Sequence, residues 1–135
     1  MSRVLRSLLV TASFALAAAA YAEESPQATP KIDQTTLLKR IERKDASLIV
    51  LDVRTPEEFR AGHIPGAVNI PYNHLPARIS ELPDASDKDI VVYCAVGVRA
   101  EQGAERLREN GFTRLLHLDG DMQAWQEKKL PEAKR

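Results

Sequence analysis

The sequence contains a single cysteine, Cys94, in 135 residues. One cysteine excludes an intrachain disulfide, so this residue forms an intermolecular bridge, packs as a small apolar side chain or serves as a reactive thiol. Positive charge is not in excess either, because 19 Lys and Arg stand against 19 Asp and Glu, without a run of five basic residues. The chain therefore lacks the clustered cations that bind nucleic acid. Its length suits one domain.

The chain has one extended apolar segment, which lies at the N-terminus, and no other long apolar run. Two arginines precede residues 7–20, which carry no charge, and Ala20-Tyr21-Ala22 follows. This order is typical of a secretory signal. We predict that residues 1–22 are a cleaved signal peptide and that the mature protein is periplasmic. The segment is shorter than the about 20 strongly apolar residues of a membrane span, so we expect no stable membrane anchor, with an uncleaved anchor as the alternative.

The remaining chain divides into a short lead-in, one domain and a tail. Residues 23–31 hold two prolines and few apolar side chains, which predicts a disordered lead-in. We expect the domain over residues 32–130 and a C-terminal tail over residues 131–135. Removing the signal peptide takes away two arginines and no acids, so the formal charge becomes −2. That charge is too small to indicate a charged partner.

Strand and helix patterns alternate along the domain. Apolar runs at 47–52 and 90–93 are typical of strands buried on both faces of a parallel sheet, and shorter strands are expected at 67–70 and 113–118. Helices are expected at 34–43, 55–61, 73–82, 99–110 and 121–128. Thr55, Pro56 and Glu58 form a capping box with proline at the first helical position. The alternation predicts an α/β fold with a central parallel sheet flanked by helices.

Cys94 stands at the carboxyl end of the strand expected at 90–93. Ligands of open α/β sheets bind beyond the carboxyl ends of the strands. Gly97 permits a tight loop whose N–H groups can bind an anion, and Arg99 adds a permanent charge. Such surroundings lower the pKa of a thiol from about 8.5, which makes it a better nucleophile. We predict a catalytic Cys94 and a substrate-binding loop of Ala95, Val96, Gly97, Val98 and Arg99; a buried structural cysteine is the alternative.

Three separated stretches of the chain carry a family resemblance. They are LDVRTPEEF at 51–59 with GHIPGAVNIP at 62–71, VYCAVGVRA at 92–100, and GF at 111–112 with LDG at 118–120 and Trp125. The chain resembles the rhodanese family, and in particular its small single-domain periplasmic members. The resemblance implies the rhodanese-like three-layer fold.

The resemblance also implies the activity of a thiosulfate sulfurtransferase. Cys94 would take the sulfane sulfur of thiosulfate or a similar donor, hold it as a persulfide and pass it to cyanide or a thiol. No cofactor and no metal are implied. The implied partners are small-molecule sulfur donors and acceptors, with a thiol protein as a further acceptor. We expect a monomer or a weak homodimer.

The chain departs from the family pattern at two places. Asp121 follows Gly120 where the family often has a second glycine, and we expect Asp121 to cap the last helix. Val96 and Val98 stand where relatives commonly have polar or charged residues, which leaves Arg99 as the only cation of the loop.

Two other functions remain open. Rhodanese-fold phosphatases and arsenate reductases have five residues between Cys and Arg, whereas four separate Cys94 from Arg99, and the shorter loop favours a sulfur carried on the cysteine. The second alternative is a non-enzymatic persulfide carrier or binding module.

Several polar residues near the expected strand ends have structural explanations. We expect Asp52 to bind loop amides, Arg54 to pair with an acid such as Glu58, and His63 to hydrogen-bond within its turn. His74 and His117 lack the spacing of metal ligands, and we assign them no role.

Overall fold

The structure is a computed structural model that describes residues 28–82, 85 and 87–135. The predicted signal peptide and most of the predicted lead-in lie outside these residues. Among the described helices, none has the length and apolar character needed to cross a bilayer.

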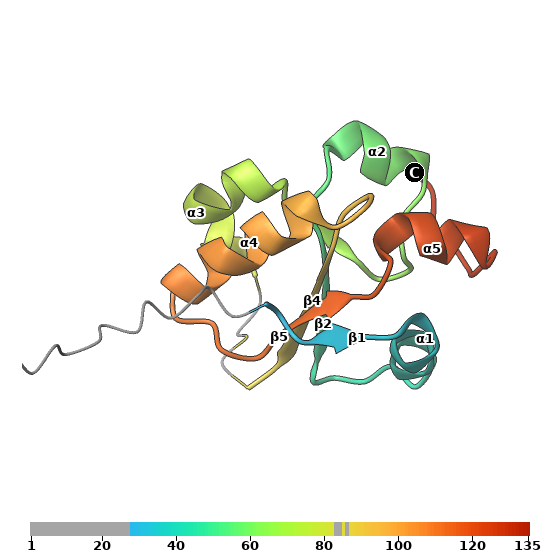
Figure 1. The fold of residues 1–135 in the computed structure, drawn as a ribbon, viewed down its shortest axis with the longest axis horizontal. Coiled ribbons are helices and arrows are strands. Elements are labelled where there is room, and N and C mark those ends of the chain that lie inside the picture. Colours follow the sequence, from blue (N-terminus) through green and yellow to red (C-terminus); the bar gives the residue numbers. More distant parts are fainter. Residues whose placement is uncertain (1–27, 83–84, 86) are drawn as a thin grey trace, which may run out of the picture.

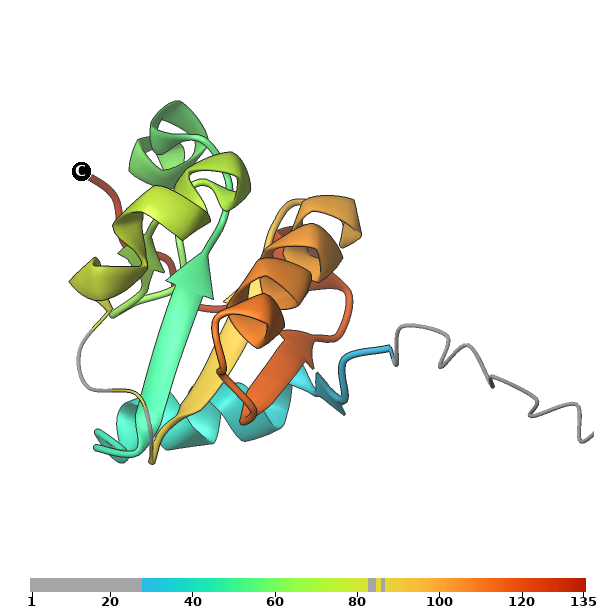
Figure 2. The same ribbon diagram turned by 90° about the vertical axis from the view of Figure 1, so that its left-hand side faces the viewer.

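Five parallel strands form one sheet in the order β1-β5-β4-β2-β3. Their bounds are Lys31–Ile32 (β1), Leu48–Asp52 (β2), Val68–Asn69 (β3), Asp89–Tyr93 (β4) and Leu115–Leu118 (β5). The two longest strands, β2 and β4, are neighbours and lie among the other three, as their nearly continuous apolar sequences predict. Figure 2 shows β2, β4 and β5 with their arrowheads at the same end, so their carboxyl ends form one edge of the sheet.

Helices cover both faces of this sheet, which confirms the predicted three-layer α/β architecture. The helix bounds are Gln34–Glu42 (α1), Pro56–Ala61 (α2), Leu75–Arg78 (α3), Val98–Glu109 (α4) and Asp121–Glu127 (α5). Figure 1 shows α3 and α4 on one side of the sheet and α1 and α5 on the other. Each strand contributes side chains to the helix layers on both sides of the sheet, because successive side chains point to opposite faces.

Two apolar cores result from this alternation. Ile49 and Leu51 of β2 belong to the core under α3 and α4, whereas Val50 belongs to the core under α1 and α5. Trp125 is fully buried in the second core, and its Nε1–H donates to the carbonyl of Pro131 at 2.8 Å. Trp125 is thus a core residue of α5.

The domain extends beyond both of its predicted ends. Thr29 is buried, and the carbonyl of Pro30 accepts a hydrogen bond from the N–H of His117 at 2.8 Å. The prediction of disorder is therefore wrong for this end of the lead-in, because its backbone completes the outer side of β5. At the other end, Ala133 of the predicted tail forms an antiparallel bridge with His63.

The helix predicted over residues 73–82 is not continuous. It consists of the four-residue α3 between two 3₁₀ turns, Tyr72–His74 and Ile79–Glu81. Pro76 lies in the first turn of α3, where its missing N–H is tolerated, and its ring cannot continue a helix from the preceding residues.

Candidate active site

Cys94 directly follows β4, at the carboxyl edge of the sheet, and its side chain is buried. The N–H of Gly97 donates to the Cys94 Sγ at 3.0 Å. Within the described part of the chain, no acceptor bonds the N–H groups of Ala95, Val96, Val98 or Arg99. These groups lead into the N-terminus of the twelve-residue α4, whose dipole favours a negative charge at this end. The segment from Cys94 to Arg99, called the Cys94 loop below, is therefore built to accept an anion carried on the sulfur.

Gly97 adopts φ +122°, a conformation that L side chains rarely adopt. A Cβ at this position would lie 3.1 Å from the Asp121 Oδ2 and 3.4 Å from the His117 Cε1. Both the backbone conformation and the close approach of these side chains therefore require glycine.

Gly97→Ala is expected to lower the rate of sulfur loading at Cys94 at least about tenfold, because alanine moves the N–H that now faces the sulfur. Gly111→Ala is the matched control, since Gly111 has φ +86° with open space around it. The control should lose stability through the same backbone strain and keep its loading rate. Stopped-flow alkylation and persulfide loading of the two variants measure the difference, and equal loading rates would contradict this role of Gly97.

The first turn of α5 holds the Cys94 loop from the opposite side. The Met122 and Gln123 N–H groups donate to the carbonyls of Cys94 and Ala95 at 3.0 and 3.1 Å. The Cys94 N–H in turn donates to the Asp121 Oδ1 at 3.0 Å. The prediction that Asp121 caps the last helix is wrong: the N-cap is Gly120, and no side chain caps it by a hydrogen bond.

We assigned His117 no role from the sequence, but its ring contacts Asp121, the residue that accepts the Cys94 N–H. Its Nδ1 lies 2.8 Å from the Glu101 Oε1, and its Nε2 lies 3.0 Å from both carboxylate oxygens of Asp121. The hydrogen bond with Asp121 raises the pKa of His117 most strongly, Glu101 adds to this effect, and burial opposes it. No spacing rule could have found this group, because its three members come from α4, β5 and α5.

Arg99 does not present a free guanidinium to the loop. Its Nη1 and Nη2 donate to the two carboxylate oxygens of Glu58 at 2.6 and 3.0 Å. Arg99 lowers the pKa of Glu58 to about 2. The prediction that Arg54 pairs with an acid is confirmed, but the acid is Asp52 and not Glu58. The expected part of Arg99 as the cation of the loop is modified, because its charge is shared with a carboxylate.

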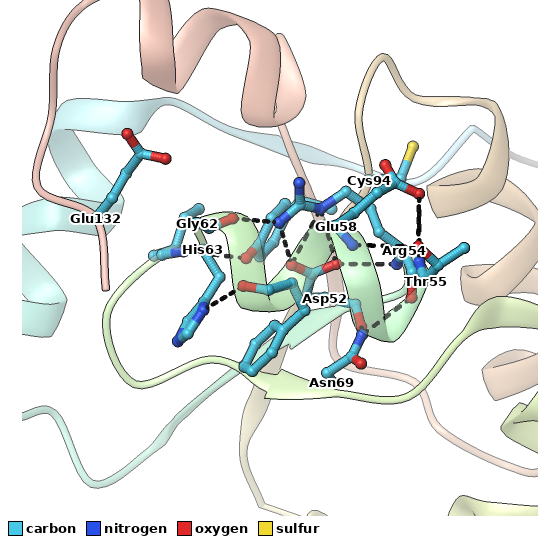
Figure 3. A network of polar contacts seen from close by, with 12 residues as sticks. Asp52, Arg54, Thr55, Glu58, Gly62, His63, Asn69, Cys94 and Glu132 are labelled. Carbon is cyan, nitrogen blue, oxygen red and sulfur yellow. Dashed lines mark hydrogen bonds and ion pairs between the residues drawn. The ribbon is translucent and has the colours of Figure 1, made fainter. Parts of the chain in front are cut away.

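Asp52 and Arg54 form a buried ion pair at the end of β2, as Figure 3 shows. The Arg54 Nη2 donates to the Asp52 Oδ2 and to the Gly62 carbonyl, both at 2.7 Å. The Asp52 Oδ1 accepts the Arg54 N–H at 2.9 Å, which agrees with the predicted binding of loop amides. Asn69 donates to the carbonyls of Asp52 and Arg54 at 3.0 Å each. This network fixes the backbone beside the candidate site.

The remaining predicted residues have simple positions. The His63 Nδ1 contacts the Phe59 carbonyl at 2.8 Å, in agreement with its expected hydrogen bond within the turn. His74 is exposed. Val96 and Val98 are 67% and 68% exposed, so the Cys94 loop presents an apolar rim of two valines to solvent.

Comparisons with known proteins agree with this geometry. Residues 33–128 match the family model described as "Rhodanese-like domain". A "Sulfurtransferase" of Allochromatium vinosum is 39% identical over 101 residues, which cover 75% of this chain and 92% of that protein. A "Putative sulfur carrier protein" of Bacillus subtilis is 30% identical over 105 residues, 78% of this chain and 55% of that one.

A solved structure shows the same fold. The crystal structure of a rhodanese-related protein from Thermoplasma volcanium superposes with a TM-score of 0.67 at 30% identity, covering 78% of this chain and 99% of that one. With the family model matched over most of the domain and a curated relative matched over nearly its full length, the chain belongs to the rhodanese-like domain family.

Proposed function

We propose that the protein is a sulfurtransferase that moves a sulfane sulfur from thiosulfate, or a similar donor, through a Cys94 persulfide to cyanide or a thiol. The observation that carries the proposal is the Cys94 sulfur itself, which accepts the Gly97 N–H at 3.0 Å, beside the N–H groups of Ala95, Val96, Val98 and Arg99, which have no acceptor among the described residues. The relation to a sulfurtransferase of Allochromatium vinosum supports the reaction class.

In the first half-reaction, the Cys94 thiolate attacks the outer sulfur of thiosulfate. A new S–S bond forms, the bond between the two thiosulfate sulfurs breaks, and its electron pair leaves with sulfite. The product is a persulfide whose terminal sulfur is negatively charged. Backbone N–H groups of the loop and the N-terminus of α4 stabilise this charge, because preorganised donors need no rearrangement when charge develops.

In the second half-reaction, the acceptor attacks the terminal sulfur of the persulfide. Cyanide leaves as thiocyanate, or a thiolate leaves as a new persulfide, and the electron pair of the broken S–S bond returns to Cys94. The cycle is a double displacement, in which the donor product leaves before the acceptor reacts. Neither step needs an added oxidant or reductant.

We also propose that this chemistry takes place in the periplasm after cleavage behind Ala22. The charged and apolar segments of residues 1–22 support this location. N-terminal sequencing of the protein from a periplasmic fraction should begin at Glu23, and an intact Met1 would overturn the assignment.

Intact-mass spectrometry of the mature protein, with and without thiosulfate, tests the reaction. We expect a gain of one sulfur atom with thiosulfate and its loss with cyanide. Because Cys94 is the only cysteine, the adduct reports on one thiol. Absence of an adduct with thiosulfate and with a small organic persulfide would overturn the proposed function.

A persulfide carrier is the second candidate, favoured by the exposed apolar rim of Val96 and Val98 and by the carrier name of the Bacillus subtilis relative. An apolar rim suits a protein surface better than a small hydrated anion. The same mass experiment separates the two functions. Release of sulfur to cyanide and small thiols supports the enzyme, whereas release only to a protein thiol supports the carrier.

A further inference from the structure

Asp121 occupies a left-handed backbone conformation that is uncommon for residues other than glycine. Its φ is +54°, and its side chain is buried. A residue other than glycine persists in this region only where its surroundings hold it in place, and such residues gather at functional sites. The contacts of its carboxylate show what holds it.

The Asp121 carboxylate is hydrogen-bonded to the Cys94 loop. Its Oδ1 accepts the N–H of Cys94 at 3.0 Å, and its Oδ2 fills space beside Gly97, 3.1 Å from where a Cβ on that residue would stand. Asp121 therefore binds the residue that carries the sulfur and lies next to the residue whose N–H faces it. It also places a buried carboxylate against the backbone of the residue that carries the sulfur, and a negative charge near a thiol disfavours the thiolate form in general.

His117 supplies the compensating charge. Each of its ring nitrogens faces a carboxylate, Glu101 at 2.8 Å and Asp121 at 3.0 Å. An ionised carboxylate only accepts hydrogen bonds, so two ionised partners favour the imidazolium form, in which both ring nitrogens donate. Burial alone would raise the pKa of Glu101, but hydrogen bonds from His117 and Thr29 together lower it, which keeps this partner ionised.

The other groups around His117 do not replace this cation. On the α4 side, the second oxygen of Glu101 accepts the Thr29 hydroxyl at 2.9 Å, and Arg108 donates to the same hydroxyl. On β1, Lys31 is the register partner of His117, but its Nζ lies 3.7 Å from Asp119 and its side chain is 62% exposed. On β4, the register partner is the apolar Val92. Arg99, the cation of the Cys94 loop, is hydrogen-bonded to Glu58. His117 is thus the cation that the carboxylates of Asp121 and Glu101 share.

We propose that His117 is a positioning residue of the sulfur-transfer site: through Asp121 it holds the Cys94 loop, and it balances the carboxylate charge that would otherwise oppose ionisation of Cys94. The inference rests on the proposed function, since a thiolate at Cys94 is what that chemistry needs. His117 touches neither sulfur nor substrate in this role.

The pH dependence follows from the direction of the His117 shift. Its pKa in the fold lies above the ordinary value of 6.5, so the charge pairing is complete below that ordinary value. The pairing is lost as the pH rises through the pKa of the folded protein. Loss of the proton leaves the Asp121 and Glu101 carboxylates without their shared cation.

The test is the pH profile of iodoacetamide alkylation, which reports on the single thiol without any sulfur donor. His117→Gln should raise the midpoint of the thiol titration by at least about 0.5 pH unit, because the carboxylates remain and their cation is gone. His117→Gln combined with Asp121→Asn removes one charge of each sign and should return the midpoint to the wild-type value. His74→Gln, at an exposed position, is the control and should change nothing.

Recovery in the double variant distinguishes charge pairing from a merely structural role, in which the two substitutions would add their damage. A double variant with a midpoint as high as that of His117→Gln would overturn the proposal. A second readout needs no variant: NMR of the wild-type protein at pH 7 should show two N–H protons on the His117 ring, and a single one would overturn the proposal. Alkylation needs no sulfur donor, so a failure of persulfide formation would contradict the proposed function separately.

Discussion

Cys94→Ser is expected to reduce sulfur transfer at least about a thousandfold, to the uncatalysed background, because the covalent intermediate cannot form. A serine hydroxyl is un-ionised at neutral pH and cannot carry the sulfane sulfur in an S–S bond. Thiocyanate formation from thiosulfate and cyanide measures the loss, and intact mass should show no added sulfur.

The fold should survive this substitution. Oxygen replaces a sulfur that accepts one hydrogen bond, from the Gly97 N–H, and a hydroxyl can accept the same bond. Thermal unfolding of the variant should therefore stay within a few degrees of wild type, at a cost of about 1 kcal/mol for a small change in a packed core. A correctly folded serine variant with full transfer activity would show that the sulfur is not the carrier and would favour a binding module.

Local signals in the sequence predicted the elements that place Cys94. The apolar runs gave β2 and β4, because such runs are typical of strands covered on both faces. The capping box at Thr55 and Glu58 is present in α2. The helix expected at 99–110 is α4, and Gly111, at φ +86°, follows its end. Each of these features depends on residues a few positions apart, which sequence patterns can describe.

The errors about the candidate site concern which side chains pair in the fold. Arg99 lies 41 positions from Glu58 and takes it as its partner, whereas Arg54 pairs with Asp52. Glu101, His117 and Asp121 meet because α4, β5 and α5 are neighbours in the fold. The unusual Asp after Gly120 was visible in the sequence, but its meaning was not, since only the structure places its carboxylate against the Cys94 N–H.

Asp52→Asn is expected to destabilise the protein by about 3–5 kcal/mol, because it leaves the buried Arg54 without a counter-charge. Asp52 is fully buried, and Arg54 is 5% exposed. The pair is held by contacts of both Nε and Nη2 of Arg54 with the carboxylate. Burial alone would lower the pKa of Arg54, but the hydrogen bond and charge of Asp52 raise it. The guanidinium therefore stays charged and depends on its partner.

A loss of this size is a large part of the 5–15 kcal/mol that typically stabilises a domain. Urea denaturation followed by far-UV circular dichroism measures it as a lower midpoint at an unchanged slope. Glu81→Gln is the matched control: it breaks the ion pair with Arg78, which is 2.6 Å long but solvent-exposed, and should cost less than about 1 kcal/mol.

A double variant separates the net contribution of the ion pair to stability from the cost of leaving one of its charges unpaired. Asp52→Leu with Arg54→Met removes both charges from the interior, and replacing a buried ion pair by apolar groups is often neutral or stabilising. We expect this variant to be more stable than Asp52→Asn, although the carbonyl of Gly62 loses its donor. If the double variant were as unstable as the single one, the stability would come from the hydrogen bonds to Gly62 and the Arg54 backbone, and an unpaired buried charge would not explain the loss.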